Sequence, residues 1–120
     1  MAKILIFVSI FLFFNVSANS NKHVHNSYDL LLALTDIKNG ESIILESGVY
    51  VGNFVINKSI NFISNGNVVL TSGGVGNILT IESSNVNVKG ILFYNSGKDM
   101  SVSDSCIFIN GSNVNIINNF

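Results

Sequence analysis

Arginine, proline and tryptophan are absent from this sequence, and charged residues make up only 11% of its 120 residues. Without arginine, and with a net charge of −1, the chain has no basic surface of the kind that binds phosphates or bases, which excludes nucleic acid as a partner. The sequence contains one cysteine, Cys106, so no disulfide can form within the chain. A packed apolar core must therefore stabilise the fold, and 48% hydrophobic residues are enough for one small domain.

Residues for catalysis are also scarce. A glycosidase needs two carboxylates at a fixed separation, and the close pair Asp99 and Asp104 lies in an irregular segment. A polysaccharide lyase needs a cation cluster to stabilise its enolate-like intermediate, and no arginine is present to supply one. Both histidines lie near the N-terminus, so no serine–histidine–aspartate set is visible. We predict an accessory or binding protein and not an enzyme, with room for a catalytic set only in coils beyond this sequence.

The N-terminus has the composition of a secretory signal peptide. Met1–Lys3 carries a positive charge, Ile4–Phe14 is apolar except for one serine, and the chain then turns small and polar. We predict that residues 1–18 are a signal peptide cleaved after Ala18, which would place the mature protein outside the cytoplasm. The alternative is a membrane anchor, but a span needs about 20 apolar residues and this run is shorter.

The next segment, residues 19–26, is polar and is predicted to be a disordered tail. It contains His23 and His25, a spacing that can hold copper or zinc through imidazole nitrogens. The alternative is that both are solvated side chains of a flexible tail.

Residues 27–120 are predicted to form the N-terminal part of a parallel β-helix domain, beginning with a short amphipathic helix, Tyr28–Lys38. Ser27 is the expected N-cap, Asp29 lies in the first turn, and the pair Asn39-Gly40 is a typical helix stop. We expect this helix to cover the open N-terminal end of a stack of strands, because unpaired strand edges invite aggregation.

A repeat organises the second half of the chain. Ile78–Phe93 and Cys106–Phe120 are similar, and Asn85 recurs as Asn113, 28 residues later. Short alternating strands with no helix between the copies indicate an all-β parallel β-helix in which each copy is one coil. Successive asparagines at one turn are expected to stack as an amide ladder, and the valines that flank Asn87 are expected to point inward.

Before the repeat, five shorter strands are expected, which brings the total to about three or four coils. These are Ser42–Glu46, Val49–Val51, Asn53–Ile56, Ile60–Ile63 and Val68–Thr71. The glycine-rich segment Ser72–Asn77 lacks the lysine and the following helix of a phosphate-binding loop, so we interpret it as a turn.

Between the two copies of the repeat, the segment Tyr94–Ser105 breaks the alternation and carries the densest cluster of functional groups. That cluster consists of Lys98, Asp99, Met100 and Asp104. The alternative interpretation is a solvated loop that bulges from the coil.

Two stretches resemble known proteins. Gly40–Tyr50, GESIILESGVY, is similar to the opening strand and turn of pectate-lyase-like right-handed β-helix proteins. Ser96–Phe108, SGKDMSVSDSCIF, resembles the corresponding stretch of the NosD family, in which a Gly-(Arg/Lys/His)-Asp-Leu segment leads to Asp-Ala-Gly-Ile-Phe. Gly97, Lys98, Asp99 and Asp104 match that pattern, whereas Met100, Ser105 and Cys106 depart from it.

The NosD resemblance implies a periplasmic protein that acts with the ATPase and permease of an ABC transporter. It also implies a role in assembling the copper centres of nitrous oxide reductase, with that enzyme or a copper chaperone as partner. Contact with the membrane would come only through these partners. If the chain itself binds copper, the candidate ligands are His23, His25, Met100 and Cys106, all imidazole or sulfur donors. The alternative roles are a small core residue for the cysteine and a gap filler for the methionine.

Two other functions are compatible with the sequence. One is a carbohydrate-binding or polysaccharide-modifying β-helix, for which Tyr50 and Tyr94 are the available aromatic residues. The other is an adhesin-like surface β-helix. In each case we expect a longer protein, because the sequence stops at Phe120 on a strand with no cap.

Overall fold

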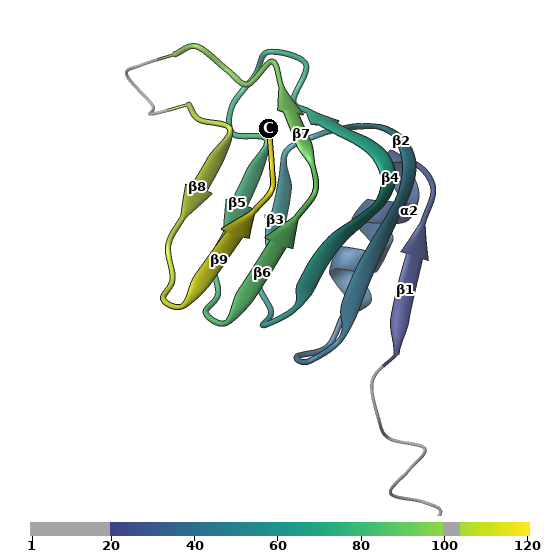
Figure 1. The fold of residues 1–120 in the computed structure, drawn as a ribbon. Helices are drawn as coiled ribbons and strands as arrows, with labels where there is room; N and C mark the ends of the chain where they lie inside the picture. The colour runs from purple at the N-terminus through teal and green to yellow at the C-terminus, as the bar shows by residue number, and fades with distance from the viewer. Residues whose placement is uncertain (1–19, 100–103) are drawn as a thin grey trace, which may run out of the picture.

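Every strand pairing in the described chain is parallel. The computed structural model describes residues 20–99 and 104–120, and its strands form two sheets (Figure 1). The larger sheet contains β1 (Asn21–Val24), β2 (Ser42–Val51), β4 (Asn61–Thr71), β6 (Val86–Lys89), β7 (Leu92–Tyr94) and β9 (Val114–Ile117). The smaller contains β3 (Phe54–Ile56), β5 (Leu79–Ile81) and β8 (Ile107–Ile109). With a single helix in the described residues, the all-β prediction is confirmed.

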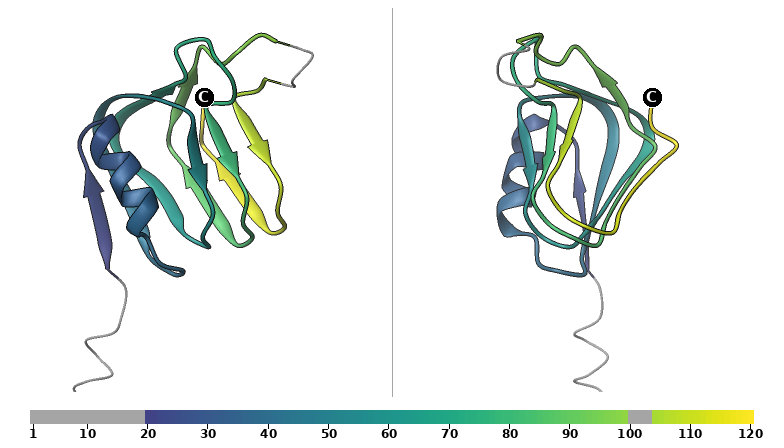
Figure 2. Two further views of the ribbon diagram at one scale, coloured as in Figure 1. Left: turned by 180° about the vertical axis from the view of Figure 1, so that it is seen from behind. Right: turned by 90° about the vertical axis from the view of Figure 1, so that its left-hand side faces the viewer.

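The chain alternates between the two sheets, so each pass around the molecule lies on the pass before it. From β2 onward the strand order in the larger sheet is β2-β4-β6-β9, while β3, β5 and β8 stack in the other sheet. The right-hand view of Figure 2 shows successive passes lying over one another when the molecule is viewed from the β8–β9 side. Asn87 pairs with Asn115 in the β6–β9 register, so the 28-residue repeat corresponds to one pass.

The core lies between the two sheets and is apolar. Strand residues alternate between fully buried and partly exposed, as the patterns of β3 and β6 show. Val86 and Val88 are fully buried, which confirms that they point inward. Val114 packs against the same core, but Ile116 remains 39% exposed because no later strand of the described chain covers it.

Asparagine side chains bond along one outward column of the larger sheet. The Asn61 amide donates to Ser42 Oγ (3.1 Å), Asn87 donates to Asn61 Oδ1 (2.8 Å), and Asn115 donates to Asn87 Oδ1 (2.8 Å). We call this column the amide ladder. A second pair at the preceding turn, Asn113 to Asn85 at 2.5 Å, confirms the predicted stacking of asparagines. Both of these turn residues have positive φ, a conformation that asparagine tolerates better than most residues.

The predicted helix exists with slightly different ends. α2 spans Ser27–Asp36, and its N-cap is Asn26, whose side-chain oxygen accepts a hydrogen bond from the Asp29 amide (2.8 Å). The prediction of Ser27 as the cap is therefore wrong, because its hydroxyl instead accepts the Val51 amide of β2 (2.8 Å). Figure 2 shows α2 at the β1 end of the stack, and its buried face joins the common core. No helix of the described residues is long and apolar enough to cross a membrane.

The prediction of a disordered tail over residues 19–26 is wrong for the part that the structure describes. Asn21–Val24 forms β1, which pairs with β2 in register, Val24 opposite Leu45. Val24 is 2% exposed, and its carbonyl oxygen accepts a hydrogen bond from the buried Tyr50 hydroxyl (2.9 Å). This strand was missed because three of its four residues are polar, so the apolar contact rests on Val24 alone. The predicted signal peptide, residues 1–18, and its cleavage after Ala18 lie outside the described residues.

Two of the expected breaks between strands do not interrupt pairing. The predicted strands Ser42–Glu46 and Val49–Val51 are parts of one strand, β2, with a register shift between Glu46 and Gly48. Ile60–Ile63 and Val68–Thr71 are likewise joined in β4. At the shift, Gly66 and Asn67 of β4 lie opposite Ser47 of β2. This irregularity is a bulge and not a loop, since both flanking segments keep their partners in the neighbouring strand.

Candidate functional site

The outward surface of β1 and β2 brings one histidine to a carboxylate. His23 lies on β1 next to the buried Val24 and therefore points outward, and His25 directly follows the strand. The register places Leu45 beside Val24, so Glu46 follows on the outward side of β2. His23 Nδ1 lies 2.8 Å from Glu46 Oε1, and the Asn65 amide donates to Glu46 Oε2 at 2.9 Å. We name these four side chains the β1–β2 patch.

The surroundings of Glu46 in this patch lower the pKa of its carboxyl group. The hydrogen bond from His23, and then the one from Asn65, hold the pKa of Glu46 below its ordinary value of 4.5. Desolvation opposes these hydrogen bonds, and the charges of His23 and then His25 lower the pKa of Glu46 by smaller amounts. Glu46 therefore stays ionised to lower pH than a free glutamate, and it can act as an anionic oxygen ligand or as the partner of a cation.

The four candidate copper ligands do not form one site. His23 lies on β1 at one end of the stack and His25 directly follows this strand, whereas Cys106 directly precedes β8 at the other end. The Cys106 thiol is exposed and contacts the Ser96 hydroxyl at 3.9 Å, so its predicted alternative role as a small core residue is wrong. Met100 lies outside the described residues. Among the residues that the structure describes, no group of three or more His, Cys, Asp or Glu side chains could hold a metal ion.

The segment that resembles NosD is tied to the glycine-rich loop of the preceding pass. The Gly97 amide donates to the Gly76 carbonyl oxygen (2.8 Å), and Ser105 donates to Asn77 Oδ1 through its amide (2.8 Å) and its hydroxyl (3.0 Å). A Cβ atom at Gly97 would collide with the Asp104 carboxylate and the Gly76 amide nitrogen. A glycine is therefore required there for packing.

The acidic pair of this segment binds its own backbone. The Asp99 amide donates to Asp104 Oδ2 at 3.0 Å, and the Asp104 amide donates to the Asp99 carbonyl oxygen at 3.3 Å. Lys98 is exposed and makes no ion pair with a described residue. Of the residues that match the NosD pattern, Gly97 and Asp104 therefore have a structural role. Lys98 is available to a partner.

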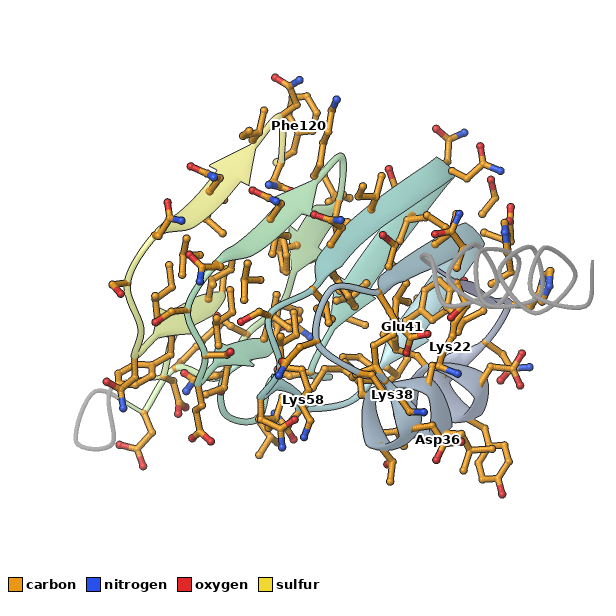
Figure 3. All side chains as sticks on the ribbon, turned by 90° about the horizontal axis from the view of Figure 1, so that it is seen from below. Lys22, Asp36, Lys38, Glu41, Lys58 and Phe120 are labelled. Carbon is orange, nitrogen blue, oxygen red and sulfur yellow. The ribbon has the colours of Figure 1, made fainter. Side chains whose placement is uncertain are left out.

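Charged side chains elsewhere are separate from these two regions. Four charged side chains lie beside α2 in Figure 3: Lys22, Lys38, Asp36 and Glu41. None of them forms an ion pair with a described residue. The one ion pair in the described chain joins His23 to Glu46. The fold therefore gathers no basic surface among the described residues, in agreement with the composition.

Of the aromatic residues predicted for sugar binding, Tyr50 is fully buried and Tyr94 is 65% exposed. Tyr50 donates from its hydroxyl to the Val24 and Glu46 carbonyl oxygens, at 2.9 and 2.6 Å, so it serves the core of the fold. The prediction that both tyrosines are available to a carbohydrate is therefore wrong for Tyr50.

Sequence reasoning missed Glu46 and Asn65 as members of the β1–β2 patch. Glu46 was assigned only to the end of a strand, and Asn65 to a turn. The alternation His23, Val24, His25 is compatible with a strand, but nothing in the sequence fixes the register of such a strand against Glu46.

Comparison with known proteins yields one partial similarity. The chain is 34% identical over 65 residues to the "Probable ABC transporter binding protein NosD" of Pseudomonas aeruginosa. The matched region is 54% of this chain but only 15% of that protein, so the chain spans a small part of its relative. No family model matches the chain, and no solved structure matches it. The relationship to NosD is therefore distant and confined to part of the chain.

Proposed function

We propose that this chain is a NosD-like accessory protein that acts with an ABC transporter outside the cytoplasm. The observation that carries the proposal is the 65-residue similarity to a protein named as an ABC transporter binding protein. The glycine, lysine and two acids of the NosD pattern fall in one segment, Ser96–Ser105, which is anchored on the preceding pass. The proposed task is assembly of the copper centres of nitrous oxide reductase, without catalysis by the chain itself.

The architecture we propose is a single-stranded right-handed parallel β-helix of the pectate-lyase-like kind. Exclusively parallel pairing supports it, as do the alternation between two sheets and the amide ladder. Right-handed connection of parallel strands is the strong general preference, because a right-twisted strand packs back onto its sheet in that hand. Such a stack presents a continuous lateral surface to a partner protein.

The binding test uses the transporter itself. We expect the protein, immobilised through an added tag, to retain the detergent-solubilised ATPase–permease complex of its own organism. Lys98→Glu should weaken retention, because Lys98 is exposed and belongs to the resembling segment. Lys89→Glu is the matched control, since Lys89 is also exposed but lies on β6. Equal retention of wild type and both variants would remove Lys98 from the binding surface, and absence of retention in all three would refute the transporter partnership.

Copper binding is the second part of the proposal. The candidate donors are separate: the imidazoles of His23 and His25 suit Cu(II), whereas the exposed Cys106 thiol suits Cu(I). Competition titrations with chromophoric chelators of each oxidation state should separate the two. Loss of uptake in the His23→Ala/His25→Ala variant but not in Cys106→Ser would assign copper to the patch. No uptake by the wild-type protein in either state would exclude copper binding by this chain while leaving a scaffold role to be tested by transporter retention.

A further inference from the structure

Three asparagines of the described chain are each followed by glycine, and the structure treats them differently. The pairs are Asn39-Gly40, Asn65-Gly66 and Asn110-Gly111. An Asn–Gly pair is the most susceptible sequence for spontaneous deamidation, because glycine has no side chain to obstruct attack by its own amide nitrogen. We propose that Asn110 is a modification site, at which deamidation by water loosens the turn between β8 and β9.

The chemistry is balanced with water as the only co-reactant. The Gly111 main-chain nitrogen loses its proton and attacks Cγ of Asn110. The new C–N bond closes a five-membered succinimide, the Cγ–Nδ2 bond breaks, and ammonia leaves. Water then opens the ring at either carbonyl, giving aspartate or isoaspartate, with no oxidation or reduction.

Two of the three pairs are held away from this geometry. The Asn39 side-chain oxygen accepts a hydrogen bond from the Ser59 amide (2.9 Å), and the Gly40 amide that would attack donates to the Ser59 carbonyl oxygen (2.7 Å). Asn65 lies within the long strand β4, and its amide donates to Glu46 Oε2 at 2.9 Å. Both side chains must break hydrogen bonds before they can react.

Asn110 has none of these restraints. It follows β8 by one residue, its side chain is exposed, and it makes no side-chain hydrogen bond to any described residue. The Gly111 amide also lacks an acceptor within the described chain. The nucleophile and the electrophile are therefore both free at this pair.

The same turn is sensitive to the product. Gly111 packs so closely that a Cβ atom there would collide with the Ser83 carbonyl oxygen of the preceding pass. Just beyond it, the Ser112 amide donates to Ser84 Oγ (3.0 Å) and the Asn113 amide group to Asn85 Oδ1 (2.5 Å). Isoaspartate adds a methylene group to the main chain at this point and a negative charge, so the turn can no longer keep both the close packing and the side-chain bonds.

The test is incubation of the folded protein at mildly alkaline pH, followed by peptide mapping with mass spectrometry. We expect conversion at Asn110 to be several-fold faster than at Asn39 and Asn65. In urea, where the structure is lost, the three rates should become similar. Glu46→Ala, which removes the acceptor of the Asn65 amide, should raise the rate at Asn65 and leave Asn110 unchanged.

Amide hydrogen exchange supplies the second readout. Protein that contains isoaspartate at position 110 should exchange faster at residues 112–117, with little change in β2. If Asn110 converts no faster than Asn39 in the folded protein, the proposed site is wrong. If it converts quickly but exchange at 112–117 is unchanged, the proposed loosening of the turn is wrong.

Discussion

At the scale of single residues, asparagine does two kinds of work in this molecule. In turns it adopts positive φ, as at Asn85 and Asn113, and along the larger sheet it bonds side chain to side chain. Its amide both donates and accepts, so one residue type can form a column of any length. An Asn-rich composition is therefore a structural requirement of the stack as well as a feature of its turns.

Asn87 is the central member of the amide ladder, so its removal should cost more than removal of the last one. Asn87→Ala loses the bonds to Asn61 and from Asn115, at about 1 kcal/mol each, and should lower the free energy of unfolding by about 2 kcal/mol. Asn115→Ala loses one bond and should cost about half as much. Urea denaturation of the wild type and the two variants measures the difference. Equal costs would contradict the assignment of two stabilising hydrogen bonds to Asn87 and one to Asn115.

The pKa of Glu46 predicts how stability depends on pH. Hydrogen bonds from His23 and Asn65 lower this pKa from 4.5 in the folded state, so the stabilisation is fully present above the unfolded value. It should be lost as the pH falls through the lower folded value. Urea midpoints measured between neutral pH and pH 3 should fall more steeply for the wild type than for Glu46→Gln, which has no charge to lose. Parallel curves would show that the bond to His23 does not stabilise the folded state.

At the scale of elements, α2 is held by one face and exposes the other. Leu30, Ala33 and Leu34 are buried, whereas Leu31 and Leu32 are each 48% exposed. The helix therefore closes the N-terminal end of the core without being enclosed itself.

Two adjacent leucines provide a matched test of this arrangement. Leu30→Ala should destabilise the protein by about 2–5 kcal/mol, because it leaves a cavity under a fully buried side chain. Leu31→Ala should change stability by less than about 1 kcal/mol, since the site is already half in water. Thermal and chemical unfolding would check both values, and similar costs would mean that the buried face of α2 has been misassigned.

The elements also show how far sequence reasoning reaches. The repeat predicted the inward valines of β6 and the stacking of Asn113 on Asn85, because both depend on local alternation and on turn residues. Sequence reasoning missed β1, because its four residues carry a single buried apolar side chain, Val24. This strand is held by pairing with β2. The prediction that the four copper ligands form one site also failed, because the distance between His23 and Cys106 depends on how many passes separate them.

At the scale of the whole molecule, the two ends of the stack differ. Near the first pass, α2 and β1 cover the core, whereas several apolar side chains of the last described pass are exposed. These are Phe108, Ile109, Ile116, Ile117 and Phe120, with exposed fractions from 39% to 81%. Exposed strand edges of this kind favour association between molecules.

We therefore expect a polypeptide that ends at Phe120 to show concentration-dependent self-association, measured by sedimentation velocity. Ile109→Lys and Ile116→Lys place a charge on the exposed apolar surface of the last pass and should reduce association with little loss of stability. Val51→Lys, at a 51% exposed position on β2, is the control. An equal reduction by the control would place the contact elsewhere.

The direction of the amide ladder has a consequence for the order in which the molecule forms. In the ladder, each asparagine donates to a residue of an earlier pass: Asn61 to Ser42, Asn87 to Asn61, and Asn115 to Asn87. A chain that becomes available from its N-terminus thus finds each acceptor already in place when the next donor arrives. Each folded pass then supplies the acceptors for the next pass, so the earliest pass sets the register of the later ones.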